Sequence, residues 1–193
     1  MKGTFESMKK SLFMLIILIF SVLLTACDDE DWIPRTRASY DISIHCEENI
    51  FEISEIESEI SAIADTYSEG AELVYVEYKF EDDNKGYAMF GFRNEYEKNE
   101  RIYVATVSIY VDLYEKTAYK VNYYEATGRA SGGYGSNRVG NKNKNAYDIY
   151  VSYKDDLETN EEVEYYYLTY MNGDIILNGC REDGSIIDGI ECE

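Results

Sequence analysis

The stretch RIYVATVSIYVDLYEKTAYKVNYYEA, residues 101–126, decides the fold. Its first half alternates apolar side chains with polar ones or tyrosines, which is the period of a β-strand with one buried face. We expect the buried face to carry Val107, Ile109, Val111 and Leu113 and the solvent face to carry Ser108, Tyr110, Asp112 and Tyr114. Glu115-Lys116 would form a turn into a second strand over residues 117–126, whose inward side chains we expect to be Tyr119, Val121 and Tyr123.

The residues before this hairpin show the same period. Residues 71–80 and 87–93 each place apolar side chains at every second position, and the segment DDNKG between them, residues 82–86, is a turn signal. Four strands joined by short turns in this way predict an antiparallel meander. A further alternating stretch, residues 40–46, indicates another strand near the start of the domain.

Between these strands the period changes to that of a helix. Apolar residues at Ile56, Ile60 and Ile63 recur at helical spacing. Ser54, followed three residues later by a glutamate, fits a capping box, and Gly70 could close the helix in a left-handed conformation. This is the one helix that the mature sequence indicates. We therefore expect an α+β fold: one amphipathic helix packed on a predominantly antiparallel β-sheet meander, with additional C-terminal strands.

Residues 127–145 interrupt the strands with a long loop that is rich in glycine and asparagine and contains no acid. Its basic residues are Arg129, Arg138, Lys142 and Lys144. The loop could lie on the acidic surface of the protein itself, contact an anionic wall polymer, or have no binding role. After it, residues 146–154, 163–171, 174–177 and 185–190 are expected to be strands that either extend the first sheet or form a second. Asn172-Gly173 predicts a two-residue hairpin turn.

Some tyrosines are predicted to point away from the core and could form an aromatic platform for a glycan or a protein. These are Tyr110, Tyr114, Tyr150, Tyr166 and Tyr170. Tyrosine suits such a surface because it combines apolar area with a polar tip. Tyrosine is also a good strand former, so the same residues are compatible with a purely structural role.

The N-terminal segment resembles a bacterial lipoprotein signal peptide. Two lysines precede an apolar run from Leu12 to Leu24, and the run ends in Leu24-Thr25-Ala26-Cys27, which is similar to a lipobox. The resemblance implies export, cleavage before Cys27 and acylation of its sulfur, so that Cys27 would hold the protein on the extracytoplasmic face of the bacterial cell membrane. An uncleaved membrane anchor is the alternative. We expect a signal peptide over residues 1–26, an acidic tether over 27–38 and a single α+β domain over 39–193.

A second resemblance covers residues 54–128. The helix, the meander and the terminal YEATG, residues 124–128, look somewhat like a PepSY domain, whose last strand commonly ends in Asp-Ala-x-Thr-Gly. Here Glu125 stands in the place of the aspartate, and one residue is missing before Thr127. The resemblance implies a role in modulating proteases or in envelope interactions, and it supplies no catalytic residue.

The charge of the chain limits its partners. The sequence holds 38 acidic and 18 basic residues, and its net charge is −20. Such a surface repels nucleic acid and anionic headgroups and attracts cations and basic proteins, so we expect no nucleic acid partner. The charge could also serve only to keep the protein soluble.

Three cysteines remain after Cys27. We expect a disulfide between Cys180 and Cys192, because Asp-Gly turn signals at 183–184 and 188–189 could fold the tail back, and we expect Cys46 to be a buried apolar residue. In an anaerobe all three would be thiols. The sequence has no CxxC pair, which argues against a cysteine metal site. The acidic segments 81–84 and 155–158 could donate oxygens to calcium but are more typical of solvated turns, and we predict no metal site.

The candidates for catalysis are few. Asp41, Ser43 and His45 alternate on one strand, which places same-face neighbours about 7 Å apart, whereas a proton relay needs contacts of about 3 Å. We therefore expect no enzymatic activity and no cofactor. The sequence favours a membrane-anchored extracytoplasmic lipoprotein that serves as a protein-interaction module of the cell envelope, with an envelope or extracellular protein as partner. The alternative is a solute-binding or glycan-binding lipoprotein.

Overall fold

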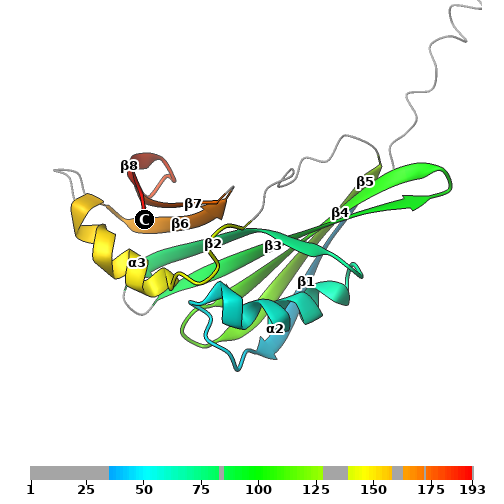
Figure 1. Ribbon diagram of the computed structural model, residues 1–193, viewed down its shortest axis with the longest axis horizontal. Helices are drawn as coiled ribbons and strands as arrows, with labels where there is room; N and C mark the ends of the chain where they lie inside the picture. Colours follow the sequence, from blue (N-terminus) through cyan, green and yellow to red (C-terminus); the bar gives the residue numbers. More distant parts are fainter. Residues whose placement is uncertain (1–34, 83–84, 128–138, 158–162, 172, 193) are drawn as a thin grey trace, which may run out of the picture. The chain divides into compact units, whose positions relative to one another are not determined.

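The computed structural model describes residues 35–82, 85–127, 139–157, 163–171 and 173–192 (Figure 1). These residues form eight strands, two α-helices and one 3-10 helix. The elements run in the order β1 (Arg35–His45), α2 (Ile53–Asp65), β2 (Glu72–Asp82), β3 (Lys85–Lys98), β4 (Arg101–Asp112), β5 (Thr117–Thr127), α3 (Ala146–Tyr153), η1 (Lys154–Leu157), β6 (Tyr165–Met171), β7 (Asp174–Cys180) and β8 (Ile186–Glu191). No helix in the described ranges has the length and apolarity that crossing a bilayer requires.

All eight strands belong to one antiparallel sheet with the order β1-β5-β4-β3-β2-β6-β7-β8. The expected meander is confirmed, because β2, β3, β4 and β5 are consecutive neighbours. Strand β6 pairs with the outer edge of β2, so the C-terminal strands extend the first sheet. Strand β1 pairs with β5 from Arg35 onward, so residues 35–38 of the expected tether belong to the sheet.

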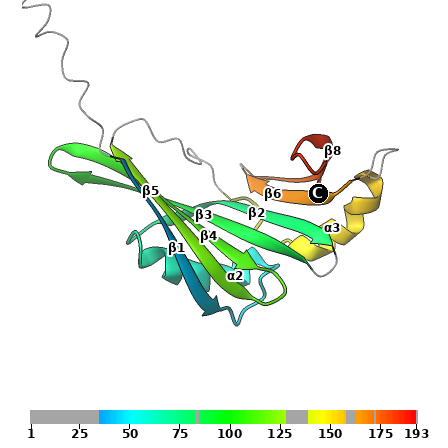
Figure 2. The same ribbon diagram turned by 180° about the vertical axis from the view of Figure 1, so that it is seen from behind.

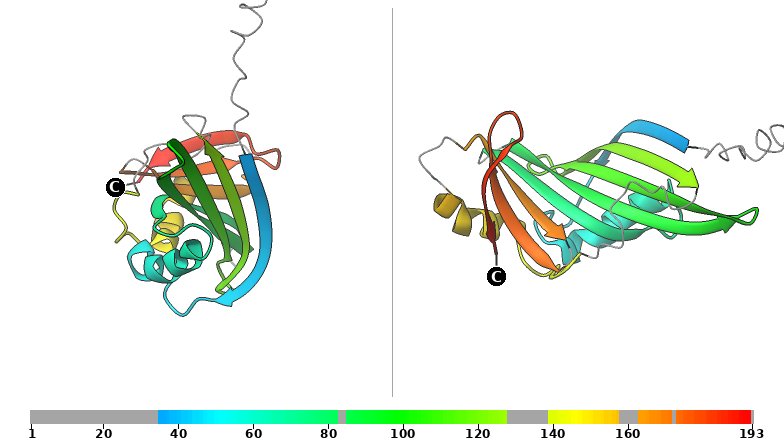
Figure 3. Two further views of the ribbon diagram at one scale, coloured as in Figure 1. Left: turned by 90° about the vertical axis from the view of Figure 1, so that its right-hand side faces the viewer. Right: turned by 90° about the horizontal axis from the view of Figure 1, so that it is seen from above.

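The core lies between one face of the sheet and the two helices. In the central parts of β2, β3 and β4 every second residue is buried there, as expected for Val107, Ile109 and Val111. Buried residues of α2 and α3 belong to the same hydrophobic cluster. The strands curve around both helices in Figure 3 (left), and β1, β4 and β5 lie in front of α2 in Figure 2. The prediction of a β-rich α+β fold is confirmed at this level.

The predicted capping box at the start of α2 is wrong. The helix begins at Ile53, two residues earlier than the box requires, and the preceding Glu52 makes no side-chain capping bond. Ser54 lies in the first turn, where its N–H donates to the carbonyl of Lys142 at 3.1 Å. A backbone carbonyl from a distant segment therefore takes the role expected of the serine hydroxyl. Gly70 does adopt a left-handed conformation, with φ +76, but it lies beyond the helix end at Asp65.

Residues 146–153 form helix α3, so the predictions of a strand there and of a single helix in the chain are wrong. The side-chain oxygen of Asn145 accepts from the N–H groups of Tyr147 at 3.0 Å and Asp148 at 3.2 Å, which is a helix N-cap. Ala146, Ile149 and Tyr150 are then buried at the i, i+3, i+4 spacing of a helix face. The alternating apolar residues of this short segment fit a strand equally well, and the cap decides between the two.

Tyr119 was predicted to point inward, and a β-bulge makes this prediction wrong. Tyr110 pairs with Lys120 and Val111 pairs with Ala118, so Tyr119 is an extra residue in β5. The bulge turns Ala118 and Val121 toward the core and leaves Tyr119 39% exposed. The predicted turn at 115–116 is confirmed by the β4–β5 pairing. Met171 pairs with Asp174 on either side of the predicted turn at 172–173, and residue 172 itself lies outside the described residues. The turn signal at 188–189 is wrong, because both residues lie within β8.

Candidate functional site

The face of the sheet that points away from the helices carries a connected group of tyrosines. We define the tyrosine surface as Tyr87, Tyr110, Tyr119, Tyr165 and Tyr167, which lie on β3, β4, β5 and β6. The alternation of strand side chains places them there, because their strand neighbours belong to the hydrophobic core. In the described ranges, both helices lie on the opposite face.

The rings of the tyrosine surface touch one another across the strands. The ring centroids of Tyr87 and Tyr110 are 5.9 Å apart, and those of Tyr110 and Tyr119 are 6.3 Å apart. The hydroxyls of Tyr87 and Tyr167 are 3.2 Å apart, and the Tyr167 ring packs on that of Tyr165 at 5.2 Å. The result is a connected path of tyrosines from β5, β4 and β3 across β2 to β6.

Positive and negative side chains are interleaved with these rings. The ammonium of Lys79 lies 4.2 Å from the centroid of the Tyr165 ring and 2.8 Å from Oε1 of Glu81. Lys120 lies over Tyr110 at 5.8 Å. Burial raises the pKa of Glu77, whose carboxylate accepts a hydrogen bond from the Tyr75 hydroxyl at 2.7 Å. The surface thus combines apolar rings, hydroxyl donors and charges of both signs.

The five tyrosines that were predicted to point outward lie in different environments. Tyr110 lies in the tyrosine surface and is half-buried, whereas Tyr114 lies beyond the end of β4 and packs against the hydrophobic core. The prediction is wrong for Tyr150, Tyr166 and Tyr170, which are 4%, 9% and 0% exposed. Tyr150 lies on a helix rather than a strand, and its ring stacks on Phe80 with a centroid separation of 4.3 Å.

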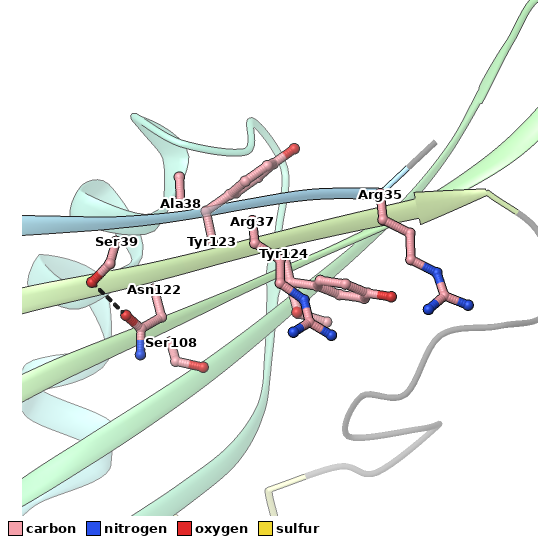
Figure 4. Close-up of a pocket in the computed structure, with 9 residues that line it drawn as sticks. Arg35, Arg37, Ala38, Ser39, Ser108, Asn122, Tyr123 and Tyr124 are labelled. Atoms are coloured by element: carbon pink, nitrogen blue, oxygen red, sulfur yellow. Dashed lines mark hydrogen bonds between the residues drawn. The ribbon is translucent and has the colours of Figure 1, made fainter. Parts of the chain in front are cut away.

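A second feature of the same face is a pocket of about 750 Å³ over β1, β4 and β5. Its described lining is Arg35, Arg37, Ala38, Ser39, Thr106, Ser108, Asn122, Tyr123 and Tyr124. In Figure 4 the side chains of both arginines, Ser39, Ser108, Asn122 and Tyr124 point to one side of the strands, whereas Ala38 and Tyr123 point to the other. The arginines were not predicted as site residues because they were assigned to the tether, although the alternation of β1 continues through them.

The basic loop residues that the structure describes contact the protein itself. Lys142 forms an ion pair with Glu57 of α2 at 2.6 Å. The backbone carbonyl of Lys144 accepts a hydrogen bond from the hydroxyl of Tyr170 at 3.0 Å. Arg129 and Arg138 lie outside the described residues. The two lysines are therefore not brought to the tyrosine surface, and their contacts fasten residues 142–144 to α2 and β6.

The cysteines do not form the predicted bridge. Cys46, Cys180 and Cys192 are all buried and free, as was expected for Cys46 alone. The N–H of Cys192 donates to the carbonyl of Ile175, at the start of β7, whereas Cys180 lies at its end. Five residues of strand separate the two positions by about 17 Å, far more than the Cα separation of about 4.4–6.8 Å that a disulfide allows. Cys27, the expected lipidation site, lies outside the described residues.

The remaining candidates from the sequence are the possible catalytic residues of β1 and the acidic segments that could bind calcium. Asp41, Ser43 and His45 are exposed on edge strand β1, and a register shift between Asp41 and Ile44 breaks their common facing. In the ranges that the structure describes, no group of three His, Cys, Asp or Glu side chains could hold a metal ion. Glu81 forms ion pairs with Lys79 and Lys85, and Asp155 and Asp156 are exposed in η1.

The comparisons with known proteins add no relative: no family model, no curated protein and no solved structure matches the chain.

Proposed function

We propose that this chain is a non-enzymatic lipoprotein of the extracytoplasmic membrane face that binds another envelope or extracellular protein through its tyrosine surface. The lipobox-like segment ending at Cys27 supports the location. The arrangement of the domain supports the binding role, because the helices cover one face of the sheet and the tyrosines occupy the other.

The observation that carries this proposal is the continuity of the tyrosine surface. Protein interfaces are enriched in tyrosine, which buries a large apolar area at small entropic cost. The Tyr87 ring packs on that of Tyr110 on the neighbouring strand, and its hydroxyl contacts that of Tyr167 across β2, so the sheet holds these side chains in place before a partner arrives. Binding therefore requires little ordering of side chains, which favours affinity.

Capture of the partner from native envelope extract tests this proposal. The full chain, purified in detergent and immobilised, is compared with Tyr110→Ser and Tyr103→Ser. Tyr103 is the matched control, because it lies on the same strand but stacks on Tyr96, at a centroid separation of 5.5 Å, away from the tyrosine surface. We expect one protein to be retained by the parent chain and by Tyr103→Ser and lost with Tyr110→Ser. Equal capture by all three chains contradicts the proposal.

The anchor has a separate test. Cys27→Ala removes the only sulfur that the lipobox-like segment offers for acylation. We expect this variant to leave the membrane fraction, and we expect the parent protein to carry the mass of attached acyl chains. Membrane partitioning that does not change, together with an unacylated parent mass, contradicts the lipoprotein assignment.

A second candidate function, binding of a solute or glycan, is favoured by the pocket over β1, β4 and β5. Its volume of about 750 Å³ lies within the range of small-molecule sites. Its polar lining is of the kind that orients a hydroxylated ligand.

A further inference from the structure

The pocket over β1, β4 and β5 concentrates positive charge in a strongly acidic protein. Arg35 and Arg37 are alternate residues of one strand, so their Cα atoms lie about 7 Å apart on the same face. None of the described lining residues is acidic. Within the described ranges, neither guanidinium has a carboxylate within ion-pair distance, although the chain holds 38 acidic residues.

The nearest acidic side chain on β5 is directed elsewhere. Glu125 follows Tyr124 and therefore points to the opposite face of the sheet, where it accepts hydrogen bonds from the hydroxyls of Tyr96 and Tyr123, each at 2.5 Å. On β1, Asp41 faces Lys120 and lies four residues, about 14 Å, beyond Arg37. Among the described residues, no carboxylate therefore pairs with either arginine.

The pocket also holds oriented donors. The guanidinium of Arg37 lies over the Tyr124 ring, 5.3 Å from its centroid, which restricts its orientation. The Ser39 hydroxyl donates to Oδ1 of Asn122 at 2.8 Å, and the Asn122 amide therefore keeps both N–H donors for another acceptor. Two planar guanidinium groups and an amide form a set of donors that matches carboxylate or phosphate oxygens.

We infer that this pocket binds an acidic saccharide through Arg35, Arg37 and Asn122. The volume of about 750 Å³ exceeds what an inorganic anion needs and accommodates a short chain of sugar or polyol units. The guanidinium groups bind its carboxylate or phosphate oxygens, and Asn122 and the neighbouring hydroxyls bind its alcohols. The inference deepens the second candidate function above and is independent of the tyrosine surface.

Titration calorimetry on the full chain in detergent micelles tests the inference with three probes: trigalacturonate, a glycerol phosphate trimer and neutral maltotriose. We expect at least one anionic probe to bind more tightly than maltotriose, by a factor of about 10 or more. Preference for the uronate identifies the anion as a carboxylate, and preference for the other anionic probe identifies it as a phosphate. Failure of both anionic probes to bind, or equal affinity for maltotriose, overturns the inference.

Variants distinguish the contribution of the two arginines to binding from that of the overall charge of the protein. Arg37→Gln should weaken binding of the anionic probe about 10-fold, and the double variant Arg35→Gln/Arg37→Gln should weaken it about 100-fold, because each substitution removes charge-assisted hydrogen bonds. Lys98→Gln removes the same charge from an exposed position at the end of β3 and should change nothing. A loss with Lys98→Gln equal to that with Arg37→Gln overturns the inference. The double variant should still capture the protein partner, so failure of this site and failure of the tyrosine surface are distinguishable.

Discussion

Tyr78→Phe tests how the chain segment before α2 is fixed to the sheet. Tyr78 is fully buried in β2, and its hydroxyl donates to the backbone carbonyl of Ile50 at 2.9 Å. Phenylalanine keeps the ring contacts with Phe90 and Tyr170 but leaves this buried carbonyl without its donor. An unsatisfied buried acceptor costs about 1–3 kcal/mol. For a domain of this size the loss corresponds to a fall in Tm of roughly 2–4 °C per kcal/mol.

Urea unfolding followed by circular dichroism measures the effect. We expect the free energy of unfolding of Tyr78→Phe to be about 2 kcal/mol lower than that of the parent chain. This loss appears as a lower urea midpoint with an unchanged slope. Tyr119→Phe is the matched control, because Tyr119 is 39% exposed and its change should stay within about 0.5 kcal/mol. If the two variants lose the same stability, the Tyr78 hydroxyl does not hold the segment and the reasoning is refuted.

Three further predictions concern tyrosine titration, thiol reactivity and the close approach of two glycines. Burial raises the pKa of Tyr78 well above its ordinary value, and burial with the nearby Glu125 carboxylate raises that of Tyr96 to about 12. The unfolded chain therefore releases its tyrosine protons first, so the urea midpoint should fall as the pH rises from about 9 to 12; a flat profile would contradict this. The three buried thiols should resist iodoacetamide in the native protein and all react in urea without reductant, as peptide masses would show, whereas a bridged pair would stay unlabelled. Gly140→Ala would place a Cβ 2.2 Å from the Cα of Gly173 and should cost about 1–3 kcal/mol in urea unfolding, while Asn143→Ala at an exposed position should not.

Strand β4 was predictable because its second half keeps the strand period. Residues 107–112 alternate between core and open face, and the tight turn at Glu115-Lys116 fixes the next strand beside them. The position of β1 next to β5 was not predictable, because pairing between segments so far apart depends on which edge of the meander is free.

The errors come from features that the apolar alternation of a segment does not reveal, namely a helix cap, a contact with a distant strand and a β-bulge. The helix at residues 146–153 depends on the cap from Asn145 and on the burial of Tyr150 against Phe80, and neither is visible in a short alternating segment. The facing of Tyr119 was reversed by a single extra residue in β5.

The candidate sites were predictable only in part. Tyr110 was expected on the surface from the strand period, and it lies there. The arginine pocket was missed because its residues come from three strands, and only the β1–β5 and β4–β5 pairings bring Arg37, Tyr124 and Thr106 side by side.

Site-specific photo-crosslinking in the native membrane tests the central claim most directly, because it asks which face of the sheet meets a partner. A photoreactive phenylalanine at position 119 samples the tyrosine surface, and the same residue at position 148 samples the exposed side of α3. We expect one defined protein adduct from position 119 and none from position 148. No adduct at position 119, or the same adduct from both positions, would contradict it.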